Sequence, residues 1–388
     1  MKIIFSTYET KEIGGSYLRS LSLAKGLAEL KNDVELWTSA KKVTLFPKIS
    51  YEENVKIIES IGIFPYRFRK GGYDPLDIVF RTIVTLFTNC DVFHSFNHRP
   101  AATIPGLVKS LISKTKWFVD WADLWGKGGI ADRRNGPLSF VTAKVDHYTE
   151  QLIIKIANYV TPISDDLVKK ATEIRNGKKG IVFLPIGCNV KDINPINKNI
   201  AKKRLKIKNK LLVYLYVGTY DEVLLAKMFI ELHKINKNVS LLLLGPNIPN
   251  FYNQFKNEPQ ALKKIIHPGI VAREKLSLYL SAGDIMMMPF ANKEINLGKF
   301  PNKLGDYLAA GRPILANPTG EVKKLLNQEK IGIFASENPK KFAETANKFL
   351  NNNLLQESLG KNARKVARKL SWTSVAQQLE KTYLSKVK

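Results

Sequence analysis

The feature that most constrains the fold is an alternation of short apolar runs with helical patterns, which occurs once in each half of the chain. Such alternation is typical of parallel sheets whose two faces are both covered by helices. We therefore predict an α/β protein with two doubly wound domains. The expected strands include 2–7, 33–38, 159–164 and 182–187 in the first half, and 211–217, 239–244, 265–271, 284–290 and 313–316 in the second.

The boundary between the two domains is expected near a strongly basic stretch. Residues 197–210 contain seven lysine or arginine residues and no acid. This stretch is either a solvated linker or a run that binds phosphate. We predict an N-terminal domain of residues 1–195, a second domain of residues 196–371, and a terminal helix at about 372–388 that crosses back to the first domain. The stretch 339–388 is helical in pattern, with a break expected near Gly360.

The net charge of +27 predicts attraction to polyanions, which include nucleic acid, an anionic membrane surface and phosphorylated substrates. Two cysteines give neither a disulfide framework nor zinc-ligand spacing, which favours a reducing compartment. The first residues are expected to form a strand rather than a signal peptide, and no apolar run is long enough to cross a membrane. We expect a cytoplasmic protein.

Residues 300–316 have the pattern of a helix followed by a strand. Pro301 suits the start of a helix, and Gly311 followed by a proline ends it. A helix N-terminus favours anions, and Lys303 adds a full positive charge there. Asp306, one turn later, can accept hydrogen bonds from sugar hydroxyls. The stretch predicts a pocket for a phosphorylated sugar compound, or else a helix whose charged side chains are merely solvated.

Residues 117–126 form a second informative stretch, in which an apolar strand ends in Asp120 and Asp123, framed by tryptophans. Carboxylates at the carboxyl ends of parallel strands are where α/β proteins place their chemistry. Aromatic rings beside them suit a sugar or an apolar acceptor. The alternative interpretation is that both aspartates cap a turn.

Other stretches give weaker signals. Gly14 and Gly15 lie between a strand and a helix, as in a phosphate-binding turn, but the dinucleotide-binding glycine motif is absent. Residues 64–70 interleave aromatic and basic side chains, a pattern that suits a lipid interface, single-stranded nucleic acid, or a partly buried loop. His94 and His98 are four residues apart, but no helical pattern supports a metal pair.

The run Pro-x-Lys-Leu-x-Asp-Tyr-Leu-Ala-Ala-Gly-Arg-Pro at 301–313, with Gly-Glu shortly after it, resembles the nucleotide-sugar site of glycosyltransferase family 4. The aspartate-rich stretch after residue 117 resembles one branch of the same family. The resemblance implies a retaining enzyme of the GT-B fold, with two Rossmann-like domains facing a central cleft. The chain departs from the family pattern at Gly298, Ala122 and Thr219, where the family usually has a glutamate, a histidine and an arginine.

The resemblance also implies roles for individual residues. Asp123, and after it Asp120, would orient or deprotonate the acceptor hydroxyl. No metal would be required, because lysine and the helix dipole supply the positive charge. The residues expected to bind the nucleotide-diphosphate sugar are Gly14, Gly15, Gly218, Thr219, Asn302, Lys303, Leu304, Asp306 and Glu321.

The function predicted is transfer of a sugar from a nucleotide-diphosphate sugar to a polysaccharide, glycolipid or lipid-linked acceptor. The basic charge and the loop at 64–70 suggest peripheral binding to the anionic inner face of the cell membrane. Two other classes stay open, a catalytically silent GT-B scaffold and a basic nucleic-acid-binding protein. No motif for RNA or DNA binding is present, so nucleic acid is not the expected partner.

Overall fold

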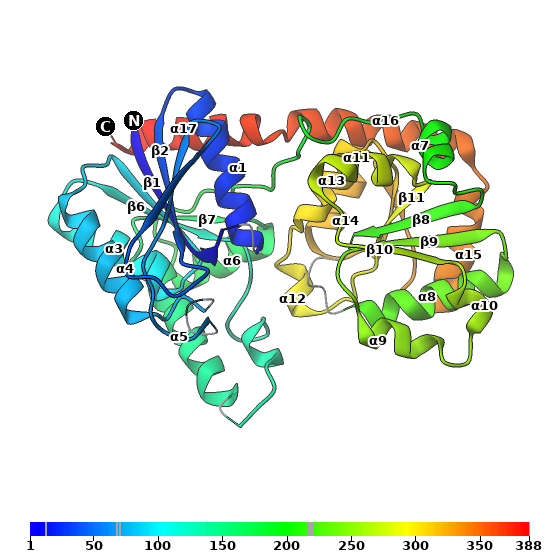
Figure 1. Ribbon diagram of the computed structural model, residues 1–388, viewed down its shortest axis with the longest axis horizontal. Coiled ribbons are helices and arrows are strands. Elements are labelled where there is room, and N and C mark those ends of the chain that lie inside the picture. The colour runs from blue at the N-terminus through cyan, green and yellow to red at the C-terminus, as the bar shows by residue number, and fades with distance from the viewer. Residues whose placement is uncertain (12–13, 67–68, 70, 138, 216–220, 388) are drawn as a thin grey trace. The chain divides into compact units, whose positions relative to one another are not determined.

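The computed structural model describes residues 1–11, 14–66, 69, 71–137, 139–215 and 221–387 (Figure 1). The chain divides into two compact units. The first unit contains residues 1–187, 298–300 and 372–388, and the second contains residues 188–297 and 301–371.

The first unit is built on a seven-stranded sheet with the order β3-β4-β2-β1-β5-β6-β7. All neighbouring strands pair in parallel except β3 and β4, which form an antiparallel hairpin at one edge. The strands are β1 (Lys2–Thr10), β2 (Asp33–Ser39), β3 (Lys48–Glu52), β4 (Val55–Glu59), β5 (Val92–Phe96), β6 (Lys116–Trp121) and β7 (Tyr159–Pro162).

Helices cover both faces of this sheet because successive strand residues point to opposite sides. Ile3 and Phe5 of β1 pack into a core with α1 and α17, whereas Ser6 bonds the backbone of α4. Gly26 of α1 allows a close approach to α17, since an added Cβ would lie 2.6 Å from that of Ala376. The helices are α1 (Gly15–Glu29), α3 (Pro75–Phe87), α4 (Pro100–Ile112), η1 (Ala131–Arg133), α5 (Ser139–Ile156), α6 (Asp165–Ile174) and α17 (Trp372–Val387).

The second unit has a six-stranded parallel sheet with the order β10-β9-β8-β11-β12-β13. Its strands read as continuous apolar runs because helices bury both faces. The strands are β8 (Lys210–Leu215), β9 (Val239–Leu244), β10 (Ile265–Gly269), β11 (Ile285–Met288), β12 (Ile314–Ala316) and β13 (Gly332–Phe334).

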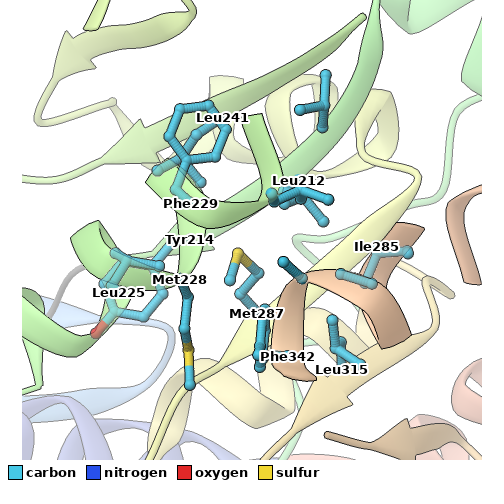
Figure 2. Close-up of a cluster of buried hydrophobic side chains, with 14 of the residues drawn as sticks. Leu212, Tyr214, Leu225, Met228, Phe229, Leu241, Ile285, Met287, Leu315 and Phe342 are labelled. Atoms are coloured by element: carbon cyan, nitrogen blue, oxygen red, sulfur yellow. The ribbon is translucent and has the colours of Figure 1, made fainter. Parts of the chain in front are cut away.

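The core of the second unit lies between this sheet and helices α8 and α15. Figure 2 shows Phe229 of α8, Met287 of β11 and Phe342 of α15 within one buried cluster. The helices are α7 (Lys198–Arg204), α8 (Glu222–Ile235), α9 (Pro249–Tyr252), η2 (Asn253–Phe255), α10 (Pro259–Leu262), α11 (Arg273–Ala282), α12 (Glu294–Leu297), α13 (Asn302–Ala309), α14 (Gly320–Glu329), α15 (Pro339–Leu350) and α16 (Asn353–Lys369).

The predicted class, two parallel Rossmann-like sheets, is confirmed, but three local predictions differ from the structure. The strand expected at 182–187 is wrong: Ile181 forms a single bridge to Val160, and the N–H groups of Val182 and Leu184 bond the carbonyls of Val160 and Pro162, where β7 ends. Residues 198–204 of the expected linker form α7. The break expected near Gly360 is absent, because α16 runs through that residue.

Candidate functional site

Asp120 lies at the carboxyl end of β6, where the sequence predicted it, but both of its oxygens are already bonded. Arg19 of α1 donates from Nε to Oδ1 and from Nη2 to Oδ2, each over 3.0 Å, and the Thr161 hydroxyl donates to Oδ2 over 3.0 Å. The two charged side chains are each 1% exposed. This buried, bidentate pair favours a positioning role for Asp120 in the region between α1 and β6.

Asp123 lies three residues further along, in the loop after β6. Its pKa is raised to about 6, chiefly by burial. The nearby Lys299 and Arg19 charges lower the pKa and the Asp120 charge raises it, and all of these effects are included in that value. A carboxyl that ionises near neutral pH can accept a proton at working pH, which suits a general base. Of the two aspartates, Asp123 has the more suitable electrostatics for proton transfer.

Gly14 caps the start of α1, and a carboxylate of the same chain occupies that helix end. Glu9 accepts a hydrogen bond from the backbone N–H of Tyr17 over 2.6 Å. Gly14 has φ +100°, and a Cβ added there would lie 2.1 Å from the Glu9 carboxyl carbon. Gly15 is the first helical residue. The glycine turn therefore closes over Glu9, which takes the position that the sequence assigned to an approaching phosphate.

Glu9 resembles Asp123 in its electrostatics. Its pKa is raised to about 7, chiefly by burial and also by the Asp123 charge, while the hydrogen bond from Tyr17 lowers it. The amino end of α1 favours the ionised form. Glu9 and Asp123 thus form an acidic pair whose total charge changes between about pH 6 and pH 7.

The loop that carries Asp123 is fixed by Glu150 of α5. The Glu150 carboxylate accepts bonds from the indole N–H of Trp121 over 2.8 Å, the backbone of Trp125 over 2.9 Å and the backbone of Gly126 over 2.8 Å. Burial raises the pKa of Glu150 to about 7. This carboxylate binds both ends of the segment from 121 to 126 and so limits its movement.

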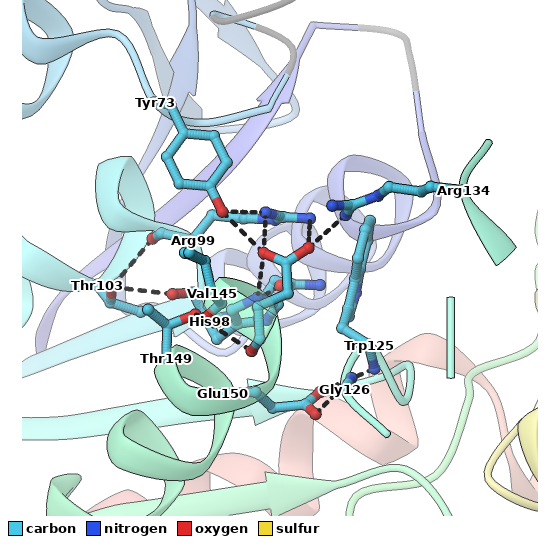
Figure 3. A network of polar contacts seen from close by, with 12 residues as sticks. Tyr73, His98, Arg99, Thr103, Trp125, Gly126, Arg134, Val145, Thr149 and Glu150 are labelled. Atoms are coloured by element: carbon cyan, nitrogen blue, oxygen red, sulfur yellow. Dashed lines mark hydrogen bonds and ion pairs between the residues drawn. The ribbon is translucent and has the colours of Figure 1, made fainter. Parts of the chain in front are cut away.

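A second carboxylate of α5, Asp146, gathers a network of buried cations, drawn in Figure 3. Arg99 donates from Nη1 and Nη2 over 2.5 and 3.1 Å, Tyr73 donates over 2.8 Å, and Arg134 forms an ion pair with the other oxygen. His98 lies 3.4 Å away. These bonds hold the pKa of Asp146 below its ordinary range, although burial alone would raise it.

Lys303 is buried in the first turn of α13 in the second unit. Its side chain is largely inaccessible, and Nζ lies 3.2 Å from the Tyr214 hydroxyl and 4.2 Å from the centre of that ring. The Phe290 ring centre is 5.7 Å away. Tyr214 and Phe290 belong to the carboxyl ends of β8 and β11, so the ammonium lies at the carboxyl edge of this sheet.

The other predicted residues at the start of α13, Asn302 and Leu304, differ in whether their polar atoms are already bonded. The Asn302 Oδ1 atom is buried and has no hydrogen-bond partner among the described residues. The Leu304 N–H bonds the Pro301 carbonyl over 2.9 Å, and its side chain is in the core. Leu304 therefore supports the helix start, and Asn302 and Lys303 are the polar side chains there.

Asp306 lies one turn after Lys303. One of its oxygens accepts from the Asn189 amide over 2.8 Å, and burial raises its pKa to about 6. The Asn189 oxygen in turn accepts from Arg273 over 2.9 Å. Asp306 is thus tied to the segment at the start of the second unit.

Glu321 is buried at the second position of α14, and Thr319 just before it donates to the carbonyl of Phe290 over 3.1 Å. That bond places the start of α14 at the same sheet edge as Lys303. Gly218 and Thr219, which the sequence also assigned to the donor, lie outside the described residues.

Comparison with known proteins gives matches to a family model and to solved structures. Residues 212–352, which include Lys303, Asp306 and Glu321, match the family model "Glycosyl transferases group 1". The sucrose-phosphate synthase of Thermosynechococcus elongatus superposes with a TM-score of 0.81 at 16% identity, over 99% of this chain and 98% of its own. The chain has the GT-B fold.

Two further matches are informative. Anabaena HepE, solved in complex with UDP, superposes with a TM-score of 0.71 at 14% identity, over 99% of this chain and all of its own. A Bacillus subtilis (strain 168) protein named "Putative teichuronic acid biosynthesis glycosyltransferase TuaH" is 26% identical over 72% of this chain and 70% of its own length. Together with the family model, these matches support a glycosyltransferase.

Several residues of this GT-B chain were missed by the sequence analysis. Tyr214, the ring under Lys303, sits inside an apolar run and looks like core. Glu9 precedes the glycine turn, and this nearness to Gly14 was its only signal. Arg19 and Glu150 lie on helices far in sequence from their partners, Asp120 for the first and the loop after β6 for the second, so no local pattern marks them.

Two searches of the described residues gave negative results. They contain no group of three or more histidine, cysteine or acidic side chains arranged to hold a metal ion. In the same part of the chain, no helix has both the length and the apolar character needed to span a bilayer.

Proposed function

We propose that the protein is a retaining glycosyltransferase that moves a sugar from a nucleotide-diphosphate sugar to a polysaccharide, glycolipid or lipid-linked acceptor. The observation that carries the proposal is the buried Lys303 in the first turn of α13, inside the region that matches the group 1 family model. A buried ammonium beside a helix N-terminus supplies positive charge where a diphosphate leaving group gains negative charge. The retaining outcome rests on the resemblance to family 4.

In this mechanism the second unit binds the donor. Lys303 and the start of α13 neutralise the diphosphate as the bond between the anomeric carbon and the phosphate oxygen breaks. Asp306 and Asn302 offer oxygen atoms to sugar hydroxyls, and Glu321 lies at the same sheet edge. The lysine and the helix dipole supply the electrostatic stabilisation that other enzymes obtain from a metal ion.

The first unit supplies the acceptor chemistry. Asp123 accepts the proton of the acceptor hydroxyl as the hydroxyl oxygen bonds to the anomeric carbon on the face from which the diphosphate leaves, so that the configuration is retained. The pKa of about 6 makes this carboxylate mostly ionised at pH 7 and still basic enough to share a proton. Glu150 holds the loop in place, Asp120 fixes Arg19 at the end of β6, and neither exchanges protons with substrate.

Nucleotide binding tests the donor assignment. We expect UDP, GDP or ADP to raise the melting temperature in the presence of a chelator. Lys303→Ala should lower the apparent affinity derived from that shift at least tenfold. Lys323→Ala, which removes an exposed lysine of α14, is the matched control and should bind as the parent does. No shift with any of the three nucleotides would contradict the proposal and favour a scaffold.

A membrane-bound acceptor is a further part of the proposal. The loop at 64–70 does not support it as directly as the sequence suggested. Arg69 is buried and donates to the carbonyls of Phe64 and Ala40 over 2.8 and 2.6 Å, so this arginine does not face solvent. Residues 67, 68 and 70 lie outside the described chain. Phe64 and Tyr66 of the same loop are exposed, so its aromatic side chains fit a lipid surface better than this arginine does.

A further inference from the structure

Helix α5 buries two acidic side chains together with Ile153 and Ile154, and it exposes a row of large apolar side chains. Its buried face includes the carboxyls of Asp146 and Glu150, which hold the buried network and the loop described above. A surface helix usually turns an apolar stripe inward and charged residues outward. The exposed positions of α5 include the polar residues Thr142, Lys144, Gln151 and Lys155. They also include six large apolar or aromatic residues, with 40% to 67% of each exposed: Phe140, Val141, Val145, Tyr148, Leu152 and Ile156.

These outward side chains form a continuous stripe along the helix. Val141, Val145, Tyr148 and Leu152 recur at spacings of three and four residues, which puts them on one side. The helix spans residues 139–156, so the stripe extends over roughly 25 Å at 1.5 Å per residue. In Figure 1, α5 extends outward from the sheet of the first unit. An apolar stripe of this length on a helix surface marks an interaction site.

The charges around the stripe indicate the chemistry of its partner. Lys144 and Lys155 are exposed on the same helix, and both acidic residues of the helix are buried. The Lys144 ammonium lies 4.3 Å from the centre of the Phe140 ring, so charge and apolar surface adjoin. Aromatic and aliphatic residues flanked by lysines suit the boundary of an anionic bilayer. A second copy of this stripe would bring like charges together.

The distribution of exposed apolar residues supports the same assignment. Among the described residues, 29 large hydrophobic side chains are exposed, of which 23 belong to the first unit and 6 to the second. The net charge of +27 favours solubility, whereas exposed apolar side chains oppose it. Their concentration in one unit indicates that this unit, rather than the whole surface, meets an apolar phase.

We propose that α5 is the membrane-docking element of this protein and inserts its apolar stripe into the headgroup boundary of an anionic bilayer. Docking there also reaches the candidate acceptor loop, because Glu150 on the inner face of α5 bonds the backbone of Trp125 and Gly126. A lipid-linked acceptor would thus be received at the element that positions Asp123. Only this last step rests on the proposed function; binding to the bilayer does not.

Vesicle co-sedimentation of the full chain tests the proposal. We expect binding to phosphatidylcholine vesicles that contain phosphatidylglycerol, and at least tenfold weaker binding to pure phosphatidylcholine. The double variant Val145→Glu/Leu152→Glu should lower binding to the anionic vesicles at least tenfold. Ile270→Glu in the second unit, where the side chain is 80% exposed, is the matched control and should bind as the parent does.

Two further variants keep the test decisive. Should the double glutamate variant fail to fold by circular dichroism, Val145→Ser/Leu152→Gln replaces it. Tyr148→Trp should add a tryptophan emission that shifts to shorter wavelength with anionic vesicles. Phe87→Glu on α3 examines the other exposed apolar helix and should leave binding unchanged.

The proposal is overturned if the α5 variants bind vesicles as the parent does, if Phe87→Glu rather than the α5 change abolishes binding, or if light scattering shows that the stripe forms a dimer instead. Nucleotide thermal shifts measured on the same variants separate this result from the proposed function. A protein that binds vesicles but no nucleotide would retain the docking surface and lose the transferase assignment.

Discussion

Three carboxyl groups of the first unit have pKa values near neutral pH because the protein buries them away from water. Burial is the largest cause for Glu9, Asp123 and Glu150, whose pKa values rise to about 7, 6 and 7. The folded protein therefore binds protons more tightly at these sites than the unfolded chain does. Stability from these groups is fully present at low pH and declines as the pH rises through each folded pKa.

Asp123→Asn tests both the chemistry and this electrostatic cost. For the parent enzyme, we expect the transfer rate to rise as the pH passes through about 6, because the ionised carboxylate is the active form. The variant should lose that acid limb and about 10²- to 10⁴-fold in kcat. Above pH 7 it should also gain about 1–3 kcal/mol of stability, since the amide carries no buried charge. Rate profiles and urea unfolding measure the two effects; an unchanged acid limb would contradict the role of Asp123.

Asp120 is expected to behave differently, because its partner is a buried cation. Asp120→Ala leaves the Arg19 guanidinium without a counter-charge and should lower stability by about 3–5 kcal/mol in urea unfolding. The double variant Arg19→Met/Asp120→Leu removes both charges and should recover most of that loss. If the single and double variants are equally unstable, the ion pair is not the reason for the loss.

Local sequence patterns mark some of the candidate residues but not the contacts that hold them in place. Lys303, Asp306 and Asp123 could be named as candidates because each lies in a local pattern, a helix start or a strand end. The pairing of Arg19 with Asp120 joins residues 101 positions apart, and Glu150 reaches Trp125 across 25 positions. Such contacts depend on how β6, α1 and α5 pack, which a single sequence does not specify locally.

At the scale of elements, apolar runs predicted strands well, since nearly every expected run forms one. The failures have physical causes outside the apolar pattern. At 182–187 the partner strand β7 ends at Pro162, and in α16 the glycine at 360 serves close packing. A Cβ at Gly360 would lie 2.6 Å from the carbonyl oxygen of Gly311, so the helix is continuous and the glycine marks where α16 passes the end of α13.

The start of α1 offers a sharper test of element design. Gly14→Ala forces a side chain into the left-handed region and against the Glu9 carboxyl, so we expect a loss of about 2–4 kcal/mol. Adding Glu9→Ala removes the collision but not the backbone strain, and should recover part of the loss. Chemical denaturation of the single and double variants measures both contributions. An additive double variant would show that the glycine turn does not close on Glu9.

The whole chain divides into two compact units, and a ligand can stabilise directly only the unit that binds it. The second unit comprises residues 188–297 and 301–371, and the first includes α17 from the end of the chain. The sequence placed the boundary at residue 195, near the basic stretch, whereas the first unit ends at Gly187. Charge composition marked the neighbourhood of the boundary, but the packing of residues 188–197 with the second unit decides where it lies.

Calorimetry of the full chain tests this division together with the donor site. Because Lys303, Asp306 and Tyr214 all belong to the second unit, a nucleotide diphosphate should stabilise that unit alone. At one hundred times its dissociation constant, the ligand adds about 2.7 kcal/mol, which raises the melting temperature of a unit of this size by roughly 5–10 °C. We therefore expect two transitions, of which one moves with nucleotide and stays fixed in Lys303→Ala. A single transition that moves with nucleotide would show that the units unfold together, and two transitions that both stay fixed would remove the nucleotide from the second unit.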